Sequence, residues 1–125
     1  MTDKERAVAI GGYSPVSYFE HGPGLGKSDF AATHEGITYY LASEEQRAKF
    51  KAHPEKYVPA FGGLCAFGQS IEKDFVVDPT SYKIVDGRLL LFLKNSDLDA
   101  LKLWNQGNER ELLEKADRHF GKRAD

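Results

Sequence analysis

Residues 82–93 read YKIVDGRLLLFL, and this stretch decides the fold. Its two β-prone runs flank Asp86-Gly87, a pair that tolerates the positive φ angles of a two-residue hairpin turn. We therefore expect Tyr82–Val85 to pair antiparallel with Arg88–Leu93. Because Leu89–Leu93 is continuously apolar, this second strand is predicted to be central in the sheet and buried on both faces.

A second hairpin is predicted earlier in the chain. Phe30–His34 and Ile37–Leu41 are separated by Glu35-Gly36, which again leaves two residues for the turn. Tyr39 and Tyr40 are neighbours on the second of these strands, so their side chains are expected on opposite faces.

Helices are predicted before, between and after the hairpins. Their expected N-caps are Ser14, Ser43, Ser96 and Asn108. The first three helices should end near Gly22, Pro54 and Gly107, because glycine and proline terminate helices. The last should run to about Phe120 with an apolar stripe of Leu112, Leu113, Ala116 and Phe120. The small-residue stretch 62–68 predicts no particular element.

This pattern predicts an α+β protein: a small antiparallel sheet built from β-hairpins, with helices packed on it and a C-terminal helical tail. A length of 125 residues suits a single domain over residues 1–125, with a core of about 9–95 and C-terminal helices over 96–120. We find no internal repeat, low-complexity tract or long linker in the sequence.

The composition excludes several classes of protein. Seventeen basic and nineteen acidic residues give a formal charge of −2, which argues against a nucleic-acid partner. No apolar run is long enough for a membrane span, and the charged N-terminus does not resemble a secretory signal. With only one cysteine, Cys65, we expect a soluble cytoplasmic protein with a reduced thiol. A homodimer is an open alternative to a monomer.

Several segments together resemble the YHS domain family, in particular its stand-alone members. The segments are 12–19 (GYSPVSYF), 36–43 (GITYYLAS), Phe50, 54–57 (PEKY) with Pro59, 62–66 (GGLCA), 78–79 (DP) and 84–89 (IVDGRL). The resemblance extends from about Ala9 to Phe120, and the order and spacing of the segments make it specific as a family assignment.

The resemblance implies a relation to metal binding. The family's short core module occurs in heavy-metal transporters and in some multicomponent monooxygenases, where it is thought to bind metal. Metal-binding relatives carry a C-x-x-x-C pair that runs from a strand end into a helix, and the matching positions here are Ala42 and Gln46. The stand-alone branch keeps a Gly-Gly-x-Cys-Ala segment, which includes Cys65 in this chain.

Two candidate sites centre on Cys65. A metal site would combine Cys65 with His34 or His53, and the expected ion is a transition metal such as copper, zinc or iron. An organic ligand site would be lined by Tyr13, Tyr40, Cys65 and Phe67, with apolar walls and few polar groups. The alternative interpretation is that Cys65 is a small buried hydrophobe and that the aromatic residues belong to the core.

Three functions remain open from the sequence. The leading hypothesis is a non-catalytic accessory protein that binds a metal or small ligand near the segment Gly62–Ala66. The alternatives are a structural or protein-interaction domain without a ligand, and a thiol redox protein that uses Cys65 as its nucleophile. No catalytic residues are assigned, because neither paired carboxylates nor a Ser-His-Asp arrangement is evident.

Overall fold

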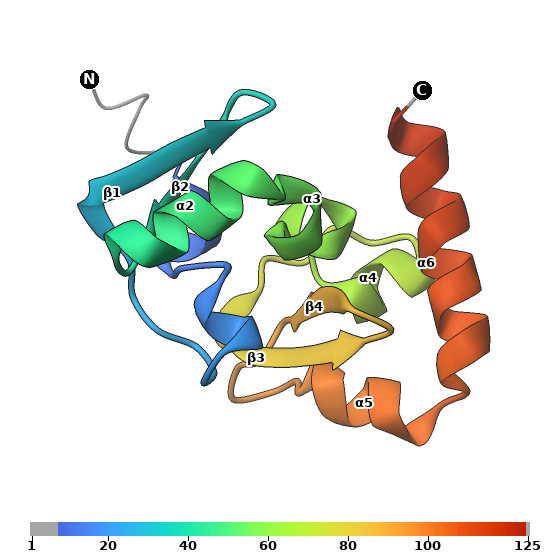
Figure 1. Ribbon diagram of the computed structural model, residues 1–125. Helices are drawn as coiled ribbons and strands as arrows, with labels where there is room; N and C mark the ends of the chain where they lie inside the picture. Colours follow the sequence, from blue (N-terminus) through green and yellow to red (C-terminus); the bar gives the residue numbers. More distant parts are fainter. Residues whose placement is uncertain (1–7, 125) are drawn as a thin grey trace. The chain divides into compact units, whose positions relative to one another are not determined.

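The structure is a computed structural model that describes residues 8–124, with side chains described up to Lys122. The chain forms two compact units, Met1–Val58 and Pro59–Asp125. Each contains one β-hairpin together with helices, so the predicted α+β class is confirmed (Figure 1).

The first unit begins with two short 3-10 helices and ends with two α-helices. Its elements are η1 (Ala9–Gly12), η2 (Ser17–Phe19), β1 (Lys27–His34), β2 (Ile37–Leu41), α2 (Glu44–Ala52) and α3 (Pro54–Tyr57). Phe50 of α2 packs on Tyr39 of β2, with their ring centroids 5.0 Å apart. Val16, Ala32, Leu41 and Tyr57 complete the buried cluster around this pair.

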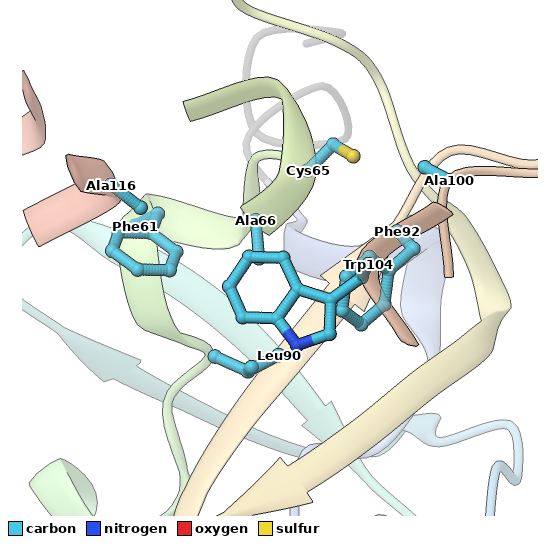
Figure 2. Close-up of a cluster of buried hydrophobic side chains, with 8 residues drawn as sticks. All are labelled: Phe61, Cys65, Ala66, Leu90, Phe92, Ala100, Trp104 and Ala116. Carbon is cyan, nitrogen blue, oxygen red and sulfur yellow. The ribbon is translucent and has the colours of Figure 1, made fainter. Parts of the chain in front are cut away.

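The second unit ends in the longest helix of the described chain. Its elements are η3 (Ala60–Gly63), α4 (Ala66–Ser70), β3 (Asp78–Val85), β4 (Arg88–Phe92), α5 (Ala100–Gln106) and α6 (Glu109–Ala124). Figure 2 shows the buried cluster of this unit, in which Trp104 of α5 lies against Phe92 of β4. Leu89, Leu90, Leu91 and Phe92 are all at most 1% exposed, which confirms the predicted burial on both faces. The predicted central position is wrong, because β4 pairs only with β3 in a two-stranded sheet.

Both predicted hairpin turns are present. In the first, Glu35 and Gly36 have φ angles of 52° and 82°, and in the second, Asp86 and Gly87 have 52° and 79°. Positive φ at both central positions is the geometry that matches the twist of the flanking strands. The hairpins form two separate two-stranded sheets, one in each unit.

The two units share one local plan, which corrects the expectation that the chain lacks an internal repeat. β3 begins 51 residues after β1, and the same offset relates β4 to β2 and η3 to η1. Both hairpins also have a register irregularity at the same place, between Lys27 and Ala31 and between Asp78 and Tyr82.

The repeated turn before each hairpin has unusual backbone angles. In η1, Ile10 and Gly11 have φ angles of 58°, and in η3, Phe61 and Gly62 have φ angles of 60° and 62°. The two turns read AIGG and AFGG. Elsewhere in the repeat few identical residues remain besides the turn glycines, which is why the sequence does not reveal it.

The structure confirms two of the predicted N-caps. The Ser43 hydroxyl accepts a hydrogen bond from the Gln46 amide at 3.1 Å, and the Asn108 side chain accepts one from the Glu111 amide at 3.0 Å. Both bonds satisfy N–H groups that the first helical turn leaves without an intrahelical partner.

The other two predicted helix starts are wrong. The segment after Ser14 forms only the single 3-10 turn η2, and α5 begins after Asp99 rather than Ser96. The Asp99 carboxylate accepts a hydrogen bond from the Lys102 amide at 3.1 Å. The stretch without a predicted element forms η3 and α4.

Candidate functional site

The residues predicted to form a site lie in different units. Tyr13, Tyr40, His34 and His53 belong to the first unit, and Cys65 and Phe67 belong to the second. Each group is therefore described within its own unit.

Cys65 is enclosed at the start of α4, where it is the N-cap residue. Its Sγ accepts hydrogen bonds from the Gly68 amide at 3.4 Å and from the Leu93 amide at 3.3 Å. The side chain is 0% exposed, and Figure 2 shows its sulfur directed away from the Phe61 ring. The sulfur thus connects the first turn of a helix to the end of β4.

Ser14 holds the corresponding position in the first unit, 51 residues before Cys65. Its Oγ lies 3.4 Å from the Ser17 amide, as the sulfur of Cys65 does from Gly68. The residue after β2, Ala42, also corresponds to Leu93 after β4. The Ala42 amide donates to Gln46 Oε1 rather than to Ser14, at 2.9 Å.

Gln46 is the centre of a buried polar network in the first unit. Its Oε1 accepts hydrogen bonds from the Ser14 hydroxyl at 2.6 Å and from the Ala42 amide. Its Nε2 donates to Ser17 Oγ and to Glu20 Oε1, both at 3.1 Å. All four bonds converge on a side chain that is 5% exposed, so Gln46 fixes the geometry of this unit's interior.

The network ends at an ion pair on the surface. Lys49 Nζ lies 2.7 Å from Glu20 Oε2. The hydrogen bond from Lys49, followed by the one from Gln46, holds the pKa of Glu20 below its usual 4.5. Glu20 is thus kept ionised, and its charge is matched by a lysine and by an amide donor.

Residues 42 and 46 do not fit a metal ion. Ala42 has no donor atom in its side chain, and both amide atoms of Gln46 already make two hydrogen bonds each. A metal at this place would have to break that network without gaining a thiolate ligand.

The two candidate histidines have local partners. The His34 ring stands edge-on to Phe50 with centroids 6.5 Å apart, and its Nε2 lies 3.8 Å from Glu35. His53 is the C-cap of α2, and its amide donates to the Lys49 carbonyl at 3.1 Å. Among the described residues, no group of three or more His, Cys, Asp or Glu side chains is arranged to hold a metal.

Of the predicted ligand-binding residues, Tyr40 borders a cavity. The cavity has a volume of about 330 Å³ and is lined by Val8, Gly11, Gly12 and Tyr40. Tyr13 pairs through its backbone with Leu25, and Phe67 packs against the buried cluster of the second unit.

A further cleft, which the sequence did not indicate, lies in the second unit. It has a volume of about 320 Å³ and is lined by Ser70, Glu72, Lys115, Arg118, His119 and Lys122. The four basic residues follow the spacing of one helix face, which is a signal available from the sequence. The contribution of residues 70 and 72 cannot be recognised in the sequence, because it depends on how α4 packs on α6.

Comparisons with known proteins found no relative of this chain. No family model matches the chain, and neither the curated proteins nor the solved structures contain a match. Within residues 8–124, no helix is both long enough and apolar enough to cross a bilayer.

Proposed function

We propose that this chain is a non-catalytic accessory protein that acts by binding a partner or ligand, with Cys65 in a structural role. The observation that carries the proposal is the enclosure of the Cys65 sulfur, which has no exposed surface and accepts two backbone hydrogen bonds. A redox or nucleophilic thiol must be reached by its substrate as a thiolate. A structural or protein-interaction domain is therefore better supported than a thiol redox protein.

The relation to the YHS family is part of this proposal. It is supported by the position of Ala42 directly after β2 and of Gln46 in the first turn of α2, because the family's cysteine pair runs from a strand end into a helix. Since Gln46 is already fully hydrogen-bonded, we assign no metal to these positions.

The reactivity of the thiol tests the structural role of Cys65. We expect an aromatic disulfide reagent to modify Cys65 at least 100-fold more slowly in the folded protein than in urea, because the reagent needs an exposed thiolate. The matched control is the double variant Cys65→Ser with Ser96→Cys, which moves the thiol to an exposed position. Modification of Cys65 as fast as that of the control would contradict the proposal.

Elemental analysis tests the metal hypothesis on the same protein, purified without chelator or affinity tag. We expect no stoichiometric copper, zinc or iron in either the wild-type protein or the Cys65→Ser variant. A near-stoichiometric metal in the wild type that is lost in the variant would overturn the structural role and establish a metal-binding accessory protein.

A second candidate function is binding of a small organic ligand at Tyr40. The cavity beside Tyr40, Gly11 and Gly12 favours it, because its volume lies at the lower end of the range of small-molecule sites. Native mass spectrometry of the purified protein should then show a bound species that persists in Cys65→Ser and is absent from Tyr40→Ala. Loss of the species from Cys65→Ser instead, or the absence of any species, would contradict a site at Tyr40.

We also propose a cytoplasmic location, which the single free cysteine supports. The choice between monomer and homodimer is decided by light scattering on the full chain.

A further inference from the structure

The cleft between the end of α4 and α6 gathers positive charge around a partly open volume. Lys115, Arg118, His119 and Lys122 recur at the spacing that places side chains on one face of a helix. Ser70 and Glu72 supply the opposite wall from the end of α4. The cleft therefore has two walls from separate elements of one unit.

The cations of the cleft are not used in ion pairs. Within the described part of the chain, no carboxylate lies within ion-pair distance of Lys115, Arg118 or Lys122. Asp117 of the same helix is instead paired with Arg88 of β4 at 2.8 Å. The helix dipole favours cations near the end of α6, but it does not account for their convergence on a cavity.

We propose that this cleft binds the phosphate group of a small phosphate monoester. The formal charges of Lys115, Arg118 and Lys122 and of the one carboxylate, Glu72, sum to +2, which matches the charge of about −1.5 to −2 on a phosphate monoester at neutral pH. The guanidinium of Arg118 offers the forked donor geometry that suits phosphate oxygens. The cleft has a volume of about 320 Å³, at the lower end of the range of small-molecule sites, which suits a small ester.

Ser70 adds a polar side chain to the wall of the cleft but has no free hydrogen to donate to a ligand. Its hydroxyl donates to the Phe67 carbonyl at 2.6 Å, and the side chain is 7% exposed. Because its hydrogen is already engaged, the donors to phosphate come from the basic side chains of α6. None of the six lining residues is Cys65 or Tyr40. Evidence for or against phosphate binding therefore does not test the roles proposed for Cys65 and Tyr40.

The test is an isothermal titration of the full chain with inorganic phosphate and with glycerol phosphate at low salt. We expect Arg118→Gln and Lys115→Gln each to raise the Kd about tenfold, since each removes a hydrogen bond to a charged group. Glu72→Gln should lower the Kd about two- to fivefold, because it removes the one negative charge of the cleft. Lys102→Gln on α5 changes the net charge by the same amount and should leave the Kd unchanged.

Four outcomes would overturn the proposal. The first is the absence of measurable binding of either phosphate compound, and the second is an equal effect of Arg118→Gln and Lys102→Gln, which would indicate a general charge effect. The third is acetate binding as tight as phosphate binding. The fourth is binding to phosphatidic acid vesicles without binding of glycerol phosphate, which would indicate a membrane surface. Circular dichroism of each variant shows whether a loss of binding reflects unfolding.

Discussion

Ser14 and Cys65 are each the second residue after the repeated turn of their unit, and each accepts a hydrogen bond from a backbone N–H group. Cys65 does so alone, with one sulfur accepting from Gly68 and Leu93. Ser14 accepts from the Ser17 amide and donates to Gln46, whose Oε1 takes the amide after the strand. In both copies the amide three residues later and the amide after the second strand need an acceptor, and the two units supply it with different side chains.

Substitutions of Cys65 should separate the contribution of its volume to the free energy of unfolding from the contribution of its hydrogen bonds. Cys65→Ala leaves the buried Gly68 amide and the partly buried Leu93 amide without an acceptor, so we expect the free energy of unfolding to fall by about 1–3 kcal/mol. Cys65→Ser keeps an acceptor, as in Ser14, and should lose no more than about 1 kcal/mol. Urea denaturation measures both, and equal losses in the two variants would show that the sulfur contributes only packing.

Gln46 should be among the least replaceable residues of the first unit. Gln46→Met keeps the length of the side chain but leaves the Ser14 hydroxyl and the Ala42 amide without an acceptor in the interior. We expect a loss of about 2–4 kcal/mol in the free energy of unfolding. Gln106→Met, at an exposed position of α5, is the matched control and should change little. A similar small effect at both positions would argue against a stabilising network.

At the scale of elements, α4 ends in a motif that usually requires glycine. The Lys73 amide donates to the Gly68 carbonyl at 2.8 Å and the Glu72 amide donates to the Gln69 carbonyl at 3.2 Å, the two hydrogen bonds of a Schellman motif. Glu72 stands at its left-handed position with φ 63°, where a Cβ is unfavourable.

Glu72→Gly should therefore stabilise the protein. We expect a gain of about 0.5–1 kcal/mol, since relief of the left-handed conformation is partly offset by the greater freedom of glycine in the unfolded chain. Thermal unfolding measures the gain. Glu72→Ala keeps the Cβ and should show none, and an equal gain in both variants would assign the effect to the lost charge.

Elements with a strong local signal were predictable from the sequence, and the start of α5 was not. Asn95 is the reason: its side chain accepts hydrogen bonds from the Asp97 and Leu98 amides, both at 2.8 Å. These bonds hold the chain in a turn past Ser96, so the helix can begin only at the next capping side chain, Asp99. Ser96 and Asp99 are equally good caps by residue type, and only this turn decides between them.

At the scale of the whole molecule, stability depends on pH through carboxylates, of which three within the described residues have a lowered pKa. Hydrogen bonds from Lys83 and then Trp104 lower the pKa of Glu109, bonds from Thr80 lower that of Asp78, and Glu20 is lowered by Lys49. Because the folded pKa values lie below the usual 4.5 for Glu and 3.8 for Asp, the unfolded state binds more protons in acid.

The contribution of these carboxylates to the free energy of unfolding should therefore be constant from neutral pH to about pH 5 and should fall as the pH drops through 4.5 and towards the lowered folded pKa values. Glu109→Gln should flatten this fall. Its cost at pH 7 should be no more than about 1 kcal/mol, since Glu109 and Lys83 are both about one-third exposed. Chemical denaturation at several pH values measures the profile, and an unchanged slope in the variant would contradict the contribution of Glu109.

Candidate sites were less predictable than elements because a site depends on tertiary packing. The sequence identifies Cys65 and Tyr40 as notable residues, but it does not show that the sulfur is enclosed or that Tyr40 borders a cavity. The basic face of α6 is periodic in sequence, whereas Ser70 and Glu72 reach the cleft only through the packing of α4 on α6.

The repeated plan of turn and hairpin has a consequence for the kinetics of folding. Each unit has its own buried cluster, and each hairpin pairs strands that are adjacent in the sequence. Such local contacts close small loops, so their formation carries a low entropic barrier and is fast. The structure therefore predicts two separate folding nuclei, and a substitution within one hairpin should slow the formation of that nucleus while the other forms at its own rate.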